Sequence, residues 1–403
     1  MSPVSSSPPA TATRGLLQRE PLKRAFAAQP ATFAADAVRN VLVRLDRALD
    51  AFGSAWPAPS SVAGVYPAIA NVEWTNGFWT GLLWLAYELT GDEKYRKAAL
   101  AQVDDFHRRI RDRINTDHHD LGFLYSLSCV AGYKLTGSDS ARQAALMAAE
   151  ALMTRYLPKA GIIQAWGDLN DPAEAGRMII DCNLNLPLLF WASQETGEAR
   201  FADAARAHLR NALTHIVRPD GSTFHTFHMD PVSGAPLNGS THQGAADASC
   251  WARGQAWGIA GFPLNYRYFN EPALISTSAA LANYFLNRLP DDLVCCWDLI
   301  FTGNDGQRDS SAAAIAACGL LELVKWLPDA DPDKGAYRAA AAAIMRNLAE
   351  GYAFAANDPG NGQLAHGVYH MPNAVGVDEC CIWGDYFYLE ALVRLTRDWE
   401  SYW

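Results

Sequence analysis

The sequence is poor in charged residues, and its basic residues do not cluster. Asp, Glu, Lys and Arg make up 19% of the 403 residues, and the formal net charge is -10. Non-specific nucleic-acid binding requires clustered Lys and Arg, so we expect no nucleic-acid partner. An anionic ligand would have to be met by a local positive feature, because the chain as a whole is acidic.

The sequence also lacks metal-like cysteine spacings and membrane segments. None of the eight cysteines forms a CxxC pair, and several lie in apolar segments typical of buried thiols. No apolar run is long enough to span a bilayer, and the start, MSPVSSSPPATATRG, has no apolar signal core. We therefore expect a flexible leader over residues 1–30, a single domain over residues 31–403, no membrane partner and a cytoplasmic location.

Strand patterns are weak, and helical segments separated by short breaks dominate. In three breaks a Thr-Gly pair follows an apolar segment, where glycine can take the left-handed conformation that ends a helix. These pairs lie at 90–91, 136–137 and 196–197. Looser breaks lie near Asn270, Pro328 and Thr396. Each break predicts a tight turn between two helices.

The helices on the two sides of each break differ in character. Those before the breaks are apolar all round and should be buried; they cover about 75–90, 120–136, 182–196, 251–269, 309–327 and 383–396. The amphipathic ones cover about 36–53, 92–113, 138–156, 198–216, 271–289 and 333–352. This alternation predicts an all-α protein, an (α/α)6 barrel with six inner and six outer helices. An open solenoid would favour a more regular period.

The long connections should lie at one end of this barrel. They run from an outer helix back to an inner one and cover 157–181, 217–250, 290–308 and 353–382. Long structured loops on one end of a barrel commonly build the site. The inner helices all begin at that end, where their N-termini favour an anion.

Two aspartates near these helix starts, Asp120 and Asp181, lie in unusually apolar surroundings. Burying a charged carboxylate is costly. An aspartate at a helix start is most often an N-cap, which suits Asp309 before two serines and could suit Asp385. A metal at His118 and His119 is not expected, because no third ligand lies at a recognised spacing.

Tryptophans gather near the same helix starts: Trp74, Trp166, Trp251 and Trp257. Each alone is compatible with a core position. Together, beside Asp, Gln and His side chains, they favour a sugar-binding platform. No GxSxG, GxGxxG or P-loop motif is present, so acid/base catalysis on a carbohydrate is the main hypothesis.

Several motifs, taken together, resemble one family from about residue 70 to the C-terminus. They are HHDLGF (118–123), MIIDCNLNLPLLFWA (178–192), RPDGSTFH (218–225), HQGAADASCWARGQAWGIAGF (242–262), DSSAAAIAACGLLEL (309–323) and GDYFYLEALVRL (384–395). The sequence is similar to the unsaturated glucuronyl hydrolases, glycoside hydrolase family 88. The resemblance implies the same barrel, no cofactor or metal, and an oligosaccharide substrate that begins with a C4=C5 unsaturated uronate.

The resemblance also assigns residues. It implies that Asp181 is the general acid/base and that Asp120 is the second catalytic carboxylate. Asp181 would protonate C4 and then take a proton from the water that adds at C5. The implied substrate-binding residues are Trp74, Trp166, His225, Gln243, Arg253 and Trp257. By charge, Arg253 is the natural partner of the uronate carboxylate.

Asp181 must therefore hold its proton near neutral pH. Apolar neighbours and a nearby Asp120 raise the pKa of such a carboxyl group, whereas a helix N-terminus lowers it. We expect the first two effects to win. The segment 372–383, PNAVGVDECCIW, lacks the Ser- and Lys-bearing pattern with which some relatives hold a sulfate, so an unsulfated disaccharide is at least as well suited as a sulfated one.

Three alternatives stay open at this point. An unsaturated rhamnogalacturonyl hydrolase would share the barrel and chemistry but act on pectin fragments. A sugar 2-epimerase would use histidines such as His225 as acid and base, and a helical scaffold would have no activity. The protein could be a monomer or a homodimer.

Overall fold

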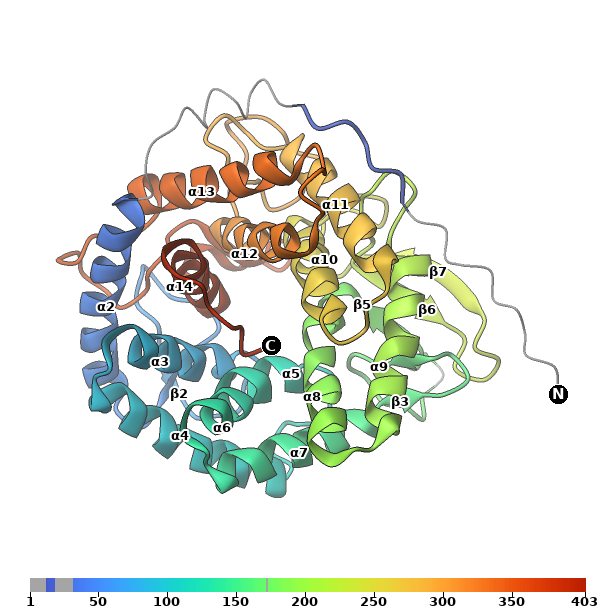
Figure 1. Ribbon diagram of the computed structural model, residues 1–403, viewed down its shortest axis with the longest axis horizontal. Helices are drawn as coiled ribbons and strands as arrows, with labels where there is room; N and C mark the ends of the chain where they lie inside the picture. Colours follow the sequence, from blue (N-terminus) through green and yellow to red (C-terminus); the bar gives the residue numbers. More distant parts are fainter. Residues whose placement is uncertain (1–11, 19–31, 172) are drawn as a thin grey trace.

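The computed structural model describes residues 12–18, 32–171 and 173–403 of the chain. Its helices form two concentric rings (Figure 1). The inner ring consists of α3 (Asn76–Thr90), α5 (Leu121–Tyr125) with α6 (Ala131–Thr136), α8 (Leu186–Thr196), α10 (Ala252–Tyr266), α12 (Ser310–Trp326) and α14 (Ile382–Thr396). The outer ring consists of α2 (Thr32–Phe52), α4 (Glu93–Arg111), α7 (Asp139–Met153), α9 (Ala199–Asn211), α11 (Pro272–Leu286) and α13 (Lys334–Gly351). The predicted (α/α)6 barrel is confirmed.

The Thr-Gly breaks end the inner helices as predicted. Gly91, Gly137 and Gly197 have φ values of 69°, 70° and 78°, and each donates its N–H to a carbonyl four residues earlier. The next helix then starts on a side-chain cap where one is available. Asp92 accepts from the Lys94 N–H, and Ser138 accepts from the Ala141 N–H. Hydrogen bonds between residues close in sequence thus determine where these helical hairpins turn.

Two inner helices are interrupted next to the site. A π-helical turn, Ser126–Val130, separates α5 from α6. The predicted helix 182–196 is divided into a 3-10 helix, Ile180–Leu184, and α8, with Pro187 in the first turn of α8. Proline is compatible with a first helical turn but cannot donate to a preceding one. Asp181 therefore lies in the 3-10 turn and not in the α-helix.

Short antiparallel strands organise the long loops, which the weak strand patterns did not predict. Strands β5 (Arg177–Ile179), β6 (Thr226–Met229) and β7 (Pro236–Ser240) form one sheet. Strands β8 (Gly367–His370) and β9 (Val375–Glu379) form a hairpin. Two further pairs are β1 (Trp56–Pro57) with β2 (Ala68–Ile69) and β3 (Tyr156–Leu157) with β4 (Ile162–Ile163). The loops at this end are therefore held by backbone hydrogen bonds.

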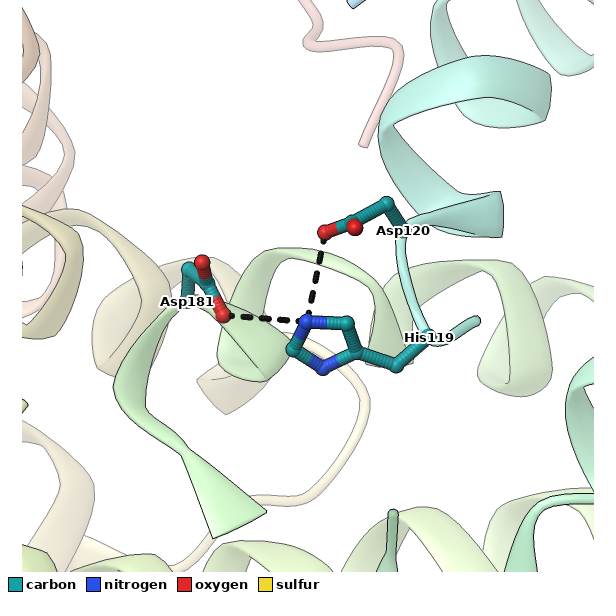
Figure 2. A group of neighbouring side chains, drawn as sticks. All are labelled: His119, Asp120 and Asp181. Atoms are coloured by element: carbon teal, nitrogen blue, oxygen red, sulfur yellow. Dashed lines mark ion pairs between the residues drawn. The ribbon is translucent and has the colours of Figure 1, made fainter. Parts of the chain in front are cut away.

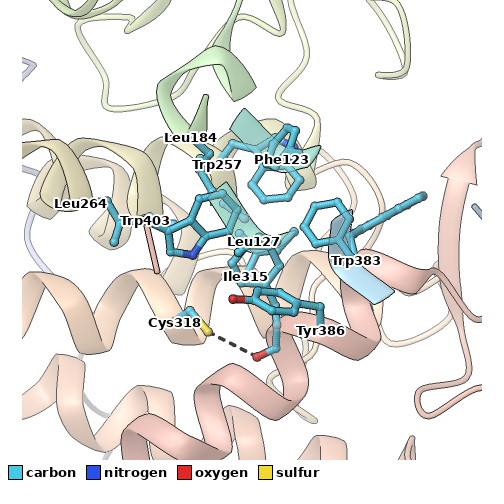
Figure 3. Packing of buried hydrophobic residues seen from close by; sticks show 14 of the residues in the cluster. Phe123, Leu127, Leu184, Trp257, Leu264, Ile315, Cys318, Trp383, Tyr386 and Trp403 are labelled. Carbon is cyan, nitrogen blue, oxygen red and sulfur yellow. Dashed lines mark hydrogen bonds between the residues drawn. The ribbon is translucent and has the colours of Figure 1, made fainter. Parts of the chain in front are cut away.

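Buried aromatic side chains pack together inside the inner ring, among them Phe123, Trp257 and Trp403 (Figure 3). The ring of Trp257 lies 5.2 Å from Phe123 and 5.5 Å from Phe387. Residues after α14 bring Trp403 to the centre of the ring, where it stacks on Phe387 at 6.0 Å and 7°. These side chains are almost completely buried. They stabilise the barrel and close its axis beneath the helix starts.

The predicted leader, residues 1–30, lies mostly outside the described residues. Its described part, residues 12–18, runs along the barrel. Arg14 forms ion pairs with Asp331 and Asp333, both at 2.7 Å, and the Thr13 N–H donates to the carbonyl of Pro219 at 3.0 Å. Among the described residues, no helix is long and apolar enough to cross a membrane.

Candidate active site

Asp120 and Asp181 both face the same nitrogen of one imidazole ring, that of His119 (Figure 2). Nε2 of His119 is 3.3 Å from an Asp120 carboxylate oxygen and 3.4 Å from an Asp181 oxygen. His119 is 1% exposed, whereas the aspartate side chains are 15% and 16% exposed. The two predicted catalytic carboxylates are thus brought together and remain accessible.

A close backbone contact sets this distance. A Cβ atom on Gly122 would lie 2.2 Å from Cα of Asn185, so only glycine lets α5 approach the 3-10 turn this closely. The side chain of Asn185 accepts the Phe123 N–H at 2.8 Å. Because Gly122 and Asn185 follow Asp120 and Asp181 by two and four residues, this contact holds the two aspartates side by side.

The two carboxyl groups have opposite electrostatic environments. Burial and the nearby Asp120 carboxylate raise the pKa of Asp181 well above its ordinary value, and the opposing effects of Arg253 and of the local backbone N–H groups are smaller. The Asp181 oxygen that lies 3.4 Å from His119 is buried and has no hydrogen-bond partner among the described residues. The shift has the direction that the sequence predicts for a proton-donating acid.

Asp120 is held as an anion. Burial acts to raise the pKa of Asp120, but His119, His118 and the Asn185 side chain outweigh it and lower the pKa below its ordinary value. The Asp120 N–H also donates to Nδ1 of His118 at 3.1 Å. Two neighbouring carboxyl groups with pKa values driven apart are typical of a divided acid/base assignment.

His119 is a neutral group at the centre of this arrangement. Burial lowers the pKa of His119 to about 4, against the opposing effect of Asp120. Its backbone N–H donates to the carbonyl of Ala165 at 3.0 Å, which fixes the imidazole between the two aspartates. The sequence suggests His119 only as a metal ligand, and its contact with both aspartates becomes visible only in the folded chain.

The same three side chains could also hold a cation. His119, Asp120 and Asp181 each offer a ligand atom within 4.8 Å of the others. The sequence shows no third ligand for His118 and His119, whereas the folded chain combines His119 with Asp120 and Asp181 and leaves His118 out of this group. The expected absence of a metal therefore stays a prediction.

His225 and Gln243 lie together beside the catalytic pair. Nδ1 of His225 accepts the backbone N–H groups of His242 at 3.0 Å and Gln243 at 3.2 Å, so its proton is on Nε2. Burial, reinforced by His242 and Arg253, lowers the pKa of His225 well below its ordinary value. A histidine in this state is a poor general acid near neutral pH, which weakens the 2-epimerase alternative.

Arg253 is already surrounded by protein partners. Its Nη1 forms an ion pair with Asp309 at 3.1 Å and donates to the Val368 carbonyl at 2.5 Å. Its Nη2 donates to Gln243 at 2.5 Å and to the Tyr369 carbonyl at 2.8 Å. The guanidinium is 1% exposed. The predicted contact with the uronate carboxylate stays a prediction, and it would require Arg253 to exchange one of these partners.

The predicted tryptophans have unequal access. Trp74 is partly buried, stacks on Trp383 at 5.4 Å and donates to the Tyr369 hydroxyl at 3.1 Å. Trp166 is partly buried and lies 5.4 Å from the ring of His242. Trp257 is 1% exposed and belongs to the aromatic axis. The structure therefore favours Trp74 and Trp166 as stacking surfaces over Trp257.

The other two candidate aspartates are structural. Asp309 caps α12 by accepting from the N–H groups of Ser311 and Ala312, as expected. Asp385 does not cap its own helix. It accepts from the N–H groups of Gln363 and Leu364, both at 3.0 Å, and from the Tyr66 hydroxyl at 2.9 Å. Burial raises the pKa of Asp385 to about 7.

Comparison with known proteins agrees with this geometry. The profile of Glycosyl Hydrolase Family 88 matches residues 60–391. An unsaturated chondroitin disaccharide hydrolase from Streptococcus pneumoniae is 50% identical over 368 residues, which cover 91% of this chain and 93% of the relative. The chain belongs to glycosyl hydrolase family 88.

Solved structures of family 88 members share the whole barrel. Unsaturated glucuronyl hydrolase from Streptococcus agalactiae is 45% identical, with a TM-score of 0.95 over 98% of this chain and 99% of that one. The enzyme from Bacillus sp. GL1 is also 45% identical, with a TM-score of 0.88 over 90% and 97% of the two chains. The expected family, barrel and enzyme class, a glycoside hydrolase, are confirmed.

Proposed function

We propose that this family 88 hydrolase releases the C4=C5 unsaturated uronate from the non-reducing end of glycosaminoglycan-type oligosaccharides. The arrangement of Asp120, His119 and Asp181 carries this proposal, because it places a carboxyl group whose pKa is raised beside one whose pKa is lowered. Relatives at 45–51% identity include hydrolases of unsaturated chondroitin disaccharides and an unsaturated glucuronyl hydrolase. A variant of the Streptococcus agalactiae enzyme was solved in complex with dGlcA-GalNAc6S.

In the proposed reaction, the Asp181 carboxylic acid transfers its proton to C4 of the uronate. Positive charge then develops at C5 and the ring oxygen, and the ionised Asp120 beside it stabilises that charge. The new Asp181 carboxylate takes a proton from water as the water oxygen bonds to C5. The product is a hemiketal, which opens and releases the adjoining sugar. Asp181 ends the cycle protonated.

The neighbouring side chains would position the substrate. Trp74 and Trp166 are accessible enough to stack on sugar rings. His225 and Gln243 would orient the water or bind ring hydroxyls. Arg253 would favour the uronate carboxylate by its positive charge, and it donates a hydrogen bond to the Gln243 side chain. Trp257 would support this layer from below. The predicted partner is thus an unsaturated oligosaccharide.

The test uses the ultraviolet absorbance of the C4=C5 uronate, which hydration removes. We expect the wild-type protein to bleach this band with at least one disaccharide from a panel derived from chondroitin, hyaluronan, heparin and pectin. Asp181→Asn should lower kcat by about a thousandfold or more, because the proton donor is lost. Asp203→Asn is a matched control, because Asp203 lies on outer helix α9 and its side chain is 67% exposed. Substantial turnover by Asp181→Asn would end the proposal.

We also propose a cytoplasmic location. All eight cysteines are buried and free, which is typical of proteins that stay in a reducing compartment. Fractionation of the source cells would test this. Whether the protein is a monomer or a homodimer stays open to a sedimentation measurement.

A further inference from the structure

Arg177 has an unusual position for an arginine. It lies on strand β5, four residues before Asp181, and is only partly exposed. Its guanidinium forms no hydrogen bond or ion pair with any part of the chain that the structure describes. No Arg177 nitrogen is among the buried atoms that lack a partner, so the guanidinium stays open to solvent. Such a cation is therefore available for a ligand.

The guanidinium lies over an aromatic face in the candidate site. Its central carbon is 4.9 Å from the ring centre of Trp166. On the same ring, His242 lies 5.4 Å away, and the His242 N–H binds the His225 imidazole. A cation stacked on Trp166 keeps its planar N–H groups free at the edge, which suits an oxyanion.

Strand β5 connects Arg177 to the catalytic residues. The Arg177 carbonyl accepts the Ala165 N–H at 2.9 Å, and the Ala165 carbonyl accepts the His119 N–H at 3.0 Å. Further along the chain, the Ile180 N–H donates to the His225 carbonyl at 3.2 Å. Arg177 and Trp166 are thus fixed relative to His119 and Asp181 by backbone hydrogen bonds.

Other arginines near the inner helix starts are occupied. Arg253 binds Asp309, Gln243 and two carbonyls. Arg155 binds Asp117 and the carbonyls of Gln164 and Gly167. The β8–β9 hairpin, residues 367–379, contains no lysine or arginine. Arg177 therefore offers a negative group on the substrate a cation that has no hydrogen-bond or ion-pair partner among the described residues.

We propose that Arg177, stacked on Trp166, forms a subsite for a sulfate ester on the leaving sugar of the disaccharide. The inference rests on the proposed function and specifies its substrate. Sulfation would then be recognised from the β5 side of the site, although the hairpin segment 372–383 lacks the Ser- and Lys-bearing pattern. Arg177 is a specificity residue here, since it takes no part in the proton transfers.

The experiment compares three unsaturated disaccharides that differ only in the leaving sugar: unsulfated, 4-O-sulfated and 6-O-sulfated. kcat/KM is measured from the loss of ultraviolet absorbance for wild type, Arg177→Gln and Arg210→Gln. Arg210 is a matched control, because it is an exposed arginine over the ring of Phe269 at 5.2 Å on outer helix α9. We expect Arg177→Gln to lower the ratio of sulfated to unsulfated kcat/KM about tenfold for one sulfate position, a size typical of a charged hydrogen bond. Arg210→Gln should keep the wild-type ratio.

A second measurement separates binding from turnover. In the Asp181→Asn background, which should not consume substrate, calorimetry should show that Arg177→Gln weakens binding of the same sulfated disaccharide by a similar factor. Salt should reduce this difference, because the contact is ionic. Arg177→Lys should retain part of the ratio, since it keeps the charge but loses the planar fork.

Three outcomes would overturn the subsite. In the first, the ratio is unchanged in Arg177→Gln. In the second, all three disaccharides lose activity equally, which would assign Arg177 to the shared uronate or to positioning. In the third, Arg177→Gln does not fold and the folded Arg177→Lys keeps the full wild-type ratio. A wild-type protein that bleaches none of the disaccharides would instead refute the proposed function.

Discussion

Asp309 caps inner helix α12, whereas Asp181 lies in the 3-10 turn that precedes inner helix α8, and the two carboxylates have opposite surroundings. Asp309 is 0% exposed and has all the partners that a buried carboxylate needs: the N–H groups of Ser311 and Ala312, the Ser311 hydroxyl at 2.5 Å and the Arg253 guanidinium. Asp181 has a second carboxylate nearby, and its buried oxygen, 3.4 Å from His119, forms no hydrogen bond with any described residue. These surroundings make Asp309 a structural carboxylate and leave Asp181 able to exchange a proton.

The largest effect on the free energy of unfolding should come from removing the charge of Asp309. We expect Asp309→Asn to lower the free energy of unfolding by about 3 kcal/mol, because it leaves the buried Arg253 charge without its ion-pair partner. Chemical denaturation at neutral pH measures this. A loss below about 1 kcal/mol would show that the carbonyls around Arg253 satisfy it alone.

Asp120→Asn should change the pH dependence of catalysis. The Asp120 carboxylate raises the pKa of Asp181, and activity requires protonated Asp181, so activity falls as the pH rises through that pKa. Removing the charge lowers the pKa of Asp181, and the alkaline limb of kcat/KM should move about one unit toward acid. Residual activity with an unmoved limb would contradict the proposed coupling. The Asp203→Asn variant again serves as the control.

The smallest effect should be that of Asp181→Asn on stability. The pKa of Asp181 is raised by folding, so its ionisation opposes folding. Its contribution to stability is fully present below the ordinary carboxyl pKa and is lost as the pH rises through the raised pKa. An asparagine cannot ionise, so the variant should gain about 1 kcal/mol relative to wild type between pH 5 and pH 8. Denaturation at the two pH values measures this gain, and a relative loss at pH 8 would contradict the assignment.

The sequence predicts the barrel well because its signals are local. The Thr-Gly breaks and the all-round apolar helices placed most helix ends within about three residues. The split of the helix at 182–196 was missed, although Pro187 marks it. The strands in the long loops were missed because two- to five-residue strands carry no measurable alternation.

The sequence predicts the site less completely, since packing decides it. The apolar surroundings of Asp120 and Asp181 indicate their importance, and the structure brings them together. The close approach of Gly122 to Asn185 and the position of His119 between the carboxylates depend on contacts across 60 residues. The burial of Trp257 and the full occupation of Arg253 likewise follow from neighbours distant in sequence.

Trp403 closes the interior of the barrel below the site. With its ring against Phe387 and Phe123 on the axis, the far end offers no exit for a sugar chain. A polysaccharide could not pass through the barrel, so a saccharide must enter and leave the site from the same side. We therefore expect the protein to trim one terminal residue at a time and to leave internal linkages untouched, whatever the length of the chain behind them.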